Sequence, residues 1–121
     1  MLLEPSPDQE FFRETTARFL VEQVPVGSLR ALRDDPTGFD DGLWARGAEL
    51  GWTSLLVDDA HGGGTISGNG LVDLTLVAHE FGRHAAPGPL LPTNVVAAPL
   101  SDVAGDTWSA VLGDLLAGTT T

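Results

Sequence analysis

Proline and glycine divide this sequence into short segments, and apolar residues recur within those segments at helical rather than strand spacing. The first segment begins with a recognisable helix start. Ser6 can cap the helix with its hydroxyl, Pro7 suits the first helical position, and Gln9 completes the pattern of a capping box. Pro25 should end this helix, because the residue before a proline is pushed out of the helical region.

The remaining segments predict an all-α fold, a bundle of five to six helices forming a single helical domain over residues 1–121. In segment 71–82 the apolar residues lie nearly all round the helix, which predicts a central, buried helix. Residues 52–57 fit an extended connector or a brief strand, and the glycine-rich stretch 58–70 predicts a loop. The other expected helices are one or two turns over 28–33, a helix from an Asp40 cap to Gly51, a short helix over 89–98, and a last helix from an Asp106 cap to Ala117, stopped by Gly118.

Length and charge restrict the function classes. The chain has 121 residues, enough for one small domain, and 17 acidic residues against six basic ones give a formal net charge of -11. Such a field repels phosphate backbones and anionic lipid, so we expect no nucleic-acid partner and no membrane partner. There is no cysteine, which excludes disulfides and thiol chemistry. No signal peptide or membrane-spanning run is visible, and we expect a cytoplasmic protein.

No motif builds a catalytic or metal centre from the residues alone. The run His61-Gly62-Gly63-Gly64 matches an oxyanion-hole string of some esterases, but the Gly-x-Ser-x-Gly nucleophile elbow is missing. His79 and His84 are five residues apart, roughly 140° around a helix, whereas zinc helices use a spacing of four. The paired acids at 34–35, 40–41 and 58–59 occupy turns and helix starts, where carboxylates act as caps. We therefore assign no catalytic and no metal-binding residue.

Two runs in a fixed order resemble a known family. Residues 48–63 read Ala-Glu-Leu-Gly-Trp-Thr-Ser-Leu-Leu-Val-Asp-Asp-Ala-His-Gly-Gly, and His79-Glu80-Phe81-Gly82 follows about fifteen residues later. Their order and spacing resemble the N-terminal helical domain of the acyl-CoA dehydrogenase family, over nearly the whole chain. Three positions depart from the family pattern: the pair 58–59 replaces Pro-Glu, His61 replaces an aromatic residue, and His79 replaces a glutamate. These departures leave the subfamily and its substrate open.

The resemblance implies a complete enzyme that dehydrogenates the α,β-bond of an acyl-CoA thioester with FAD as cofactor. Family members add a β-domain and a second helical domain, which hold the catalytic base and most flavin contacts. This chain would lack both domains, so we expect no catalysis and no cofactor from it alone. It would supply one wall of the acyl pocket, and the substrate-pocket candidates are Leu90, Thr93 and Ala97, which share one face of the helix 89–98. They suit an alkyl or ring-bearing tail, and Ala97 leaves room for a bulky group. The alternative that these three are ordinary packing positions of the domain stays open.

The resemblance also bears on partners and biology. The acidic charge makes this domain a poor holder of the coenzyme A phosphates, which should be met by basic residues elsewhere. The missing domains or a partner flavoprotein subunit are the expected partners, in a homo- or hetero-oligomer. The arginine-only, Ala/Gly/Asp-rich composition is similar to actinobacterial members, and a role in fatty acid or steroid catabolism is implied. Two alternatives stay open: a non-catalytic helical interaction module of a full-length flavoprotein, or the front domain of a related acyl-CoA oxidase or flavin monooxygenase.

Overall fold

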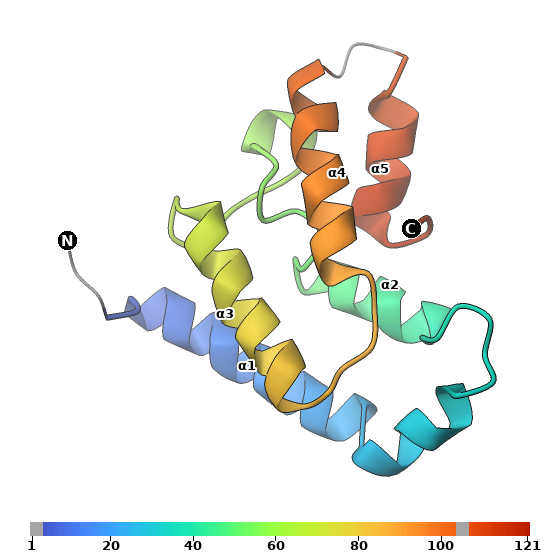
Figure 1. The fold of residues 1–121 in the computed structure, drawn as a ribbon. Helices are drawn as coiled ribbons and strands as arrows, with labels where there is room; N and C mark the ends of the chain where they lie inside the picture. Colours follow the sequence, from blue (N-terminus) through green and yellow to red (C-terminus); the bar gives the residue numbers. More distant parts are fainter. Residues whose placement is uncertain (1–3, 104–106) are drawn as a thin grey trace.

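The computed structural model describes residues 4–103 and 107–121, and it contains helices and turns without a strand in those ranges (Figure 1). The prediction of an all-α fold is confirmed. The α-helices are α1 (Pro7–Gln23), α2 (Asp41–Glu49), α3 (Gly70–Arg83), α4 (Leu90–Val103) and α5 (Ser109–Ala117), with short 3-10 helices at Val26–Leu32 and Asp59–His61.

Local signals set the ends of several helices as the sequence predicts. The Ser6 hydroxyl accepts a hydrogen bond from the Gln9 amide at 3.2 Å, and the Gln9 side chain accepts one from the Ser6 amide at 2.9 Å, which completes the capping box. Asp40 caps α2 by accepting from the Leu43 amide at 2.6 Å. Gly118 ends α5 in the left-handed conformation, φ 72°. Asp106, the expected cap of the last helix, lies outside the described residues.

The helices pack in two connected groups (Figure 1). Helix α3 crosses and contacts α1, while α4 and α5 lie side by side, and α5 also contacts α2. The stretch 52–57 runs between these groups as turns rather than as a strand, with Leu55 and Val57 buried. Because this connector is buried, its side chains pack against both groups of helices.

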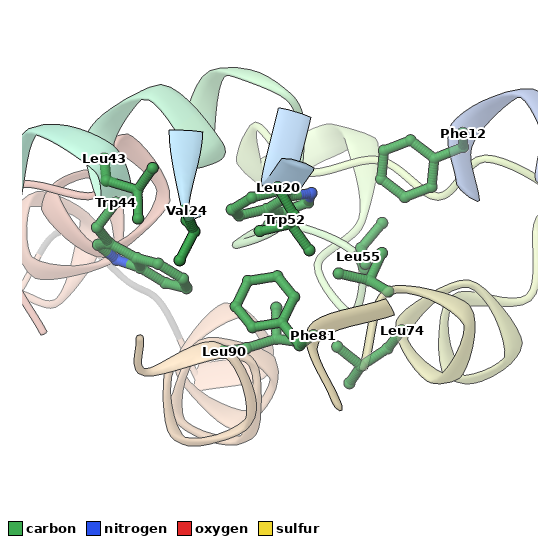
Figure 2. Close-up of a cluster of buried hydrophobic side chains, with 11 residues drawn as sticks. Phe12, Leu20, Val24, Leu43, Trp44, Trp52, Leu55, Leu74, Phe81 and Leu90 are labelled. Atoms are coloured by element: carbon green, nitrogen blue, oxygen red, sulfur yellow. The ribbon is translucent and has the colours of Figure 1, made fainter. Parts of the chain in front are cut away.

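Trp52 lies at the centre of the main core (Figure 2). Its ring packs edge-on against Phe81 at a centroid distance of 4.8 Å and against Phe19 at 5.3 Å. The indole nitrogen donates to the Thr16 hydroxyl at 3.1 Å, so the polar edge of the ring is satisfied inside the core. A side chain at Gly47 would place its Cβ 2.2 Å from the Trp52 ring, so only glycine allows α2 to approach this closely.

Two expectations about helix packing and length were wrong. Helix α3 is not buried all round, because Leu71 is 68% exposed and Val72 is also exposed. Helix α4 continues beyond residue 98, through Pro99, to Val103. Proline removes the hydrogen bond to the carbonyl four residues earlier, here that of Val95. Since Val95 lies on the exposed side of α4, water can solvate that carbonyl, which makes the interruption tolerable.

Candidate functional site

The three substrate-pocket candidates on α4 face the interior of the domain. Leu90 packs in the main core, and Ala97 packs with Val57 and Leu112 in a second apolar cluster. Thr93 is also buried, but unlike the other two it borders an apolar groove on the surface between α4 and α5. The three residues therefore share one face of α4, as the helical spacing predicts. Leu90 and Ala97 contribute to interior packing, and Thr93 contributes to the groove.

A strongly apolar groove lies between α4 and α5. It has a volume of about 270 Å³, and its walls are almost wholly hydrocarbon. We call it the α4–α5 groove. Its lining residues are Pro92, Thr93 and Val96 from α4, Val111 and Leu115 from α5, and Thr120 and Thr121 from the segment after α5.

Sequence reasoning missed most of this lining. Of the lining residues, the sequence predicted only Thr93 as part of a pocket wall, and Val96, Val111 and Leu115 were not singled out as pocket residues. The available signal was that both helices are apolar on more than one side, which leaves a second apolar surface where they meet. Val96 is 48% exposed, and its neighbours Leu91 and Val95 on the outer side of α4 are exposed as well.

Asn94 fixes the position of α4 against the connector. It is fully buried, and its side-chain amide donates to the carbonyl of Trp52 at 2.8 Å and to that of Leu90 at 2.9 Å. The bond to Trp52 ties the first turns of α4 to the centre of the core, and the bond to Leu90 lies within α4. The groove wall therefore rests on a helix that is held in place by buried hydrogen bonds.

A second buried polar residue, Asp73 on α3, organises the glycine-rich loop. One carboxylate oxygen accepts from the Gln9 side chain at 3.0 Å and the Ser67 hydroxyl at 2.8 Å. The other accepts from the amides of Ile66 at 2.8 Å and Ser67 at 3.1 Å. Burial opposes ionisation of Asp73, but these hydrogen bonds outweigh it and lower the pKa of the carboxyl. The sequence pattern did not point to this cluster.

The fully buried Glu80 forms the third polar cluster, at the end of α3. One oxygen lies 3.3 Å from a guanidinium nitrogen of Arg13 on α1 and 3.5 Å from one of Arg83. The second oxygen lies 3.5 Å from the imidazole Nε2 of His84. Glu80 is therefore paired with Arg83 on its own helix as well as with Arg13, and His79 and His84 both lie within 4 Å of this carboxylate. Within the described parts of the chain, no cluster of metal-ligating side chains occurs.

One residue of each acidic pair, namely Asp35, Asp40 and Asp58, caps a turn or a helix start as predicted. Asp58 accepts a hydrogen bond from the His61 amide at 3.1 Å, at the start of the short 3-10 helix. Asp35 accepts from the hydroxyl and amide of Thr37 and from the amide of Gly38, and these bonds lower the pKa of its carboxyl. The His-Gly-Gly-Gly run, residues 61–64, belongs to the turn that Asp58 caps. None of the described helices is long and apolar enough to cross a membrane.

Comparison with known proteins finds a family and relatives that this chain resembles. A family model described as "Acyl-CoA dehydrogenase, N-terminal domain" matches residues 6–109. A protein named Acyl-CoA dehydrogenase IpdE2 from Mycobacterium tuberculosis (strain ATCC 25618 / H37Rv) is 30% identical over 94 residues, 77% of this chain and 29% of the relative. A protein of the same name from Mycolicibacterium smegmatis (strain ATCC 700084 / mc(2)155) is 30% identical over 99 residues, 81% of this chain and 31% of the relative. The matched part thus covers less than a third of either relative, and no solved structure matches the chain significantly.

Proposed function

We propose, from the premise that this chain belongs to the acyl-CoA dehydrogenase family as an N-terminal domain, that it supplies one wall of the acyl pocket in an FAD-dependent enzyme. That enzyme would dehydrogenate the α,β-bond of an acyl-CoA thioester. The α4–α5 groove is the observation that carries the proposal. It is a hollow with hydrocarbon walls on a rigidly held helix, which suits the tail of an acyl group.

The division of labour within the enzyme follows from the polar groups of this chain. Two carboxylates are buried among the described residues: Asp73 accepts four hydrogen bonds, and one oxygen of Glu80 is paired with Arg13 and Arg83. Both side chains are fully buried, so neither can reach the α-proton of a substrate bound at the surface of this domain. In the proposal, the catalytic base lies outside this chain, and α4 and α5 bind and orient the acyl tail.

The chain offers a poor fit for FAD and for the phosphates of coenzyme A. A diphosphate favours free amides at a helix N-terminus or basic side chains. The first turns of α1, α2 and α3 are already capped by Ser6, Asp40 and Asn69, and the chain carries a formal net charge of -11. We place flavin and the coenzyme A phosphates on a β-domain, a second helical domain or a partner subunit.

The outer side of α4 supports an assembly larger than this chain. Leu91, Val95 and Val96 are exposed together there. An exposed apolar surface of this kind is more stable when another protein surface covers it. In the proposal this side packs against the other domains of the enzyme, in a homo- or hetero-oligomer. The proposed setting is the cytoplasm, in fatty acid or steroid catabolism.

Filling the groove should weaken the binding of an acyl tail. We expect Val96→Phe to weaken the binding of the hexanoyl thioester of N-acetylcysteamine by about tenfold or more, because the larger ring occupies the space of the tail. Val95→Phe is the matched control, since Val95 is 63% exposed and does not line the groove. The measurement is an NMR titration of the 121-residue chain, following the methyl signals of Val111 and Leu115.

The control separates binding from folding. Both substitutions add the same ring to an exposed position of α4, so their effects on stability should be similar and small. An absence of shifts at Val111 and Leu115 in the unsubstituted chain would contradict the proposed acyl wall. Equal weakening by both substitutions would contradict the assignment of the tail to the α4–α5 groove.

A further inference from the structure

Asn69 and Gly70 form the one Asn-Gly pair of this sequence, and they stand at the start of α3. Asn69 is exposed, and its side-chain oxygen accepts a hydrogen bond from the Val72 amide at 3.3 Å. This distance is longer than the usual range for a bond from an amide nitrogen, so the bond holds the carboxamide only weakly. The carboxamide of Asn69 is therefore accessible to reaction.

Packing and capping fix this pair in the fold. A side chain at Gly70 would drive its Cβ into the carbonyl oxygen of Leu55, so only glycine allows α3 to begin against the connector. Position 69 needs a side chain that accepts a hydrogen bond from the first turn of the helix, as asparagine does. The domain thus places asparagine directly before glycine at an exposed position.

We infer that Asn69 is a deamidation site of the folded domain. The nucleophile is the backbone nitrogen of Gly70, because amides in the first turn of a helix have no partner within the helix and glycine has no side chain to hinder the attack. This nitrogen forms a bond to Cγ of Asn69, and the bond from Cγ to the side-chain nitrogen breaks. The proton of the Gly70 amide leaves with the side-chain nitrogen as ammonia, and a succinimide ring remains.

Water then opens the ring, and the carbonyl that it attacks decides the product. Attack at Cγ breaks the bond from Cγ to the Gly70 nitrogen and gives aspartate at position 69. Attack at the main-chain carbonyl of residue 69 breaks the original peptide bond and gives isoaspartate, in which the main chain runs through Cβ and Cγ. Either route takes up one water and releases one ammonia, and no electrons are exchanged.

The two products should differ in stability. Aspartate at position 69 keeps the cap, and its charge is favourable at the start of a helix. Isoaspartate adds one carbon to the main chain before Gly70, which moves Gly70 relative to Leu55 and displaces the Ile66 amide from Asp73. We therefore expect the isoaspartyl chain to lose part of the Asp73 cluster and the aspartyl chain to keep it.

The test follows the folded 121-residue chain at mildly alkaline pH by peptide mass mapping. Asn94 is the internal comparison, since it is the second asparagine of the chain, is fully buried and precedes the β-branched Val95. We expect Asn69 to be converted at least about tenfold faster than Asn94, because the core must open before Asn94 can react. The matched variant is Asn69→Ser, which keeps a capping hydroxyl and should remove the reaction at this position without changing the urea midpoint.

A parallel sample in urea separates the chemistry of the pair from the effect of the fold. Conversion of Asn69 in urea but not in the folded chain would overturn the inference, because the cap would then protect the carboxamide. Equal rates at Asn69 and Asn94 in the folded chain would overturn it as well. The isoaspartyl chain, separated by chromatography, should unfold at a lower urea concentration than the Asn69→Asp variant, and equal midpoints would contradict the predicted loss at the Asp73 cluster.

Discussion

Trp52→Ala should lower the free energy of unfolding by about 3–5 kcal/mol, the range for truncating a large buried aromatic side chain. The indole touches both helix groups. It packs against Phe81 on α3 and Phe19 on α1 and bonds to the Thr16 hydroxyl, and its ring centroid lies 6.4 Å from that of Trp44 on α2. Its removal leaves a cavity at the centre and an unpaired hydroxyl beside it. Urea unfolding followed by far-UV circular dichroism measures the change.

Trp108 provides the matched control for this substitution. It is the same residue type, but it is exposed at the start of α5, so Trp108→Ala should change the unfolding free energy by no more than about 0.5 kcal/mol. Equal losses for the two substitutions would show that Trp52 is not the centre of the core.

Asp73→Asn should cost about 2–3 kcal/mol, because an amide cannot accept all four hydrogen bonds that the carboxylate accepts. At least one of the donors on Gln9, Ser67 or Ile66 would face the amide nitrogen. The exposed Asp114 on α5 serves as the control, and Asp114→Asn should leave stability within about 0.5 kcal/mol. Equal stability of the Asp73→Asn variant and the unsubstituted chain at pH 7 would contradict this cluster.

The same substitution has a defined pH dependence. The pKa of Asp73 is lowered in the folded state from its ordinary value of 3.8. At a pH between these two pKa values, the folded chain therefore binds fewer protons than the unfolded chain. Its contribution is fully present above pH 3.8 and is lost as the pH falls through the lowered folded value. The stability difference between the unsubstituted chain and Asp73→Asn should therefore shrink in acid, as measured by thermal unfolding from pH 7 downward. Asp35, whose pKa is also lowered, is present in both chains and cancels in this difference.

Local chemistry made much of the fold predictable. The capping box at Ser6 and Gln9, the Asp40 cap and the stop at Gly118 depend on residues close in sequence, and all are present as predicted. The Asp73 cluster could not be predicted in the same way. It joins α3 to Gln9, a residue 64 positions earlier, and a capping glutamine gives no sign of a second role.

The orientation of α4 could not be predicted from the spacing of its apolar residues either. Small apolar residues occupy several sides of this helix, so spacing alone could not decide which side faces the interior. The structure buries Leu90 and Ala97 and exposes Val95 and Val96, and the contact with α5 creates the groove. That contact depends on how two helices pack, which only the three-dimensional arrangement supplies.

The intact mass of the native gene product, purified from its own host, tests most directly whether this chain is one domain of a larger flavoenzyme. We expect a mass well above 12.6 kDa, since the matched part covers less than a third of either curated relative. A native product of 12.6 kDa would contradict the account, because the chain would then be an independent helical module.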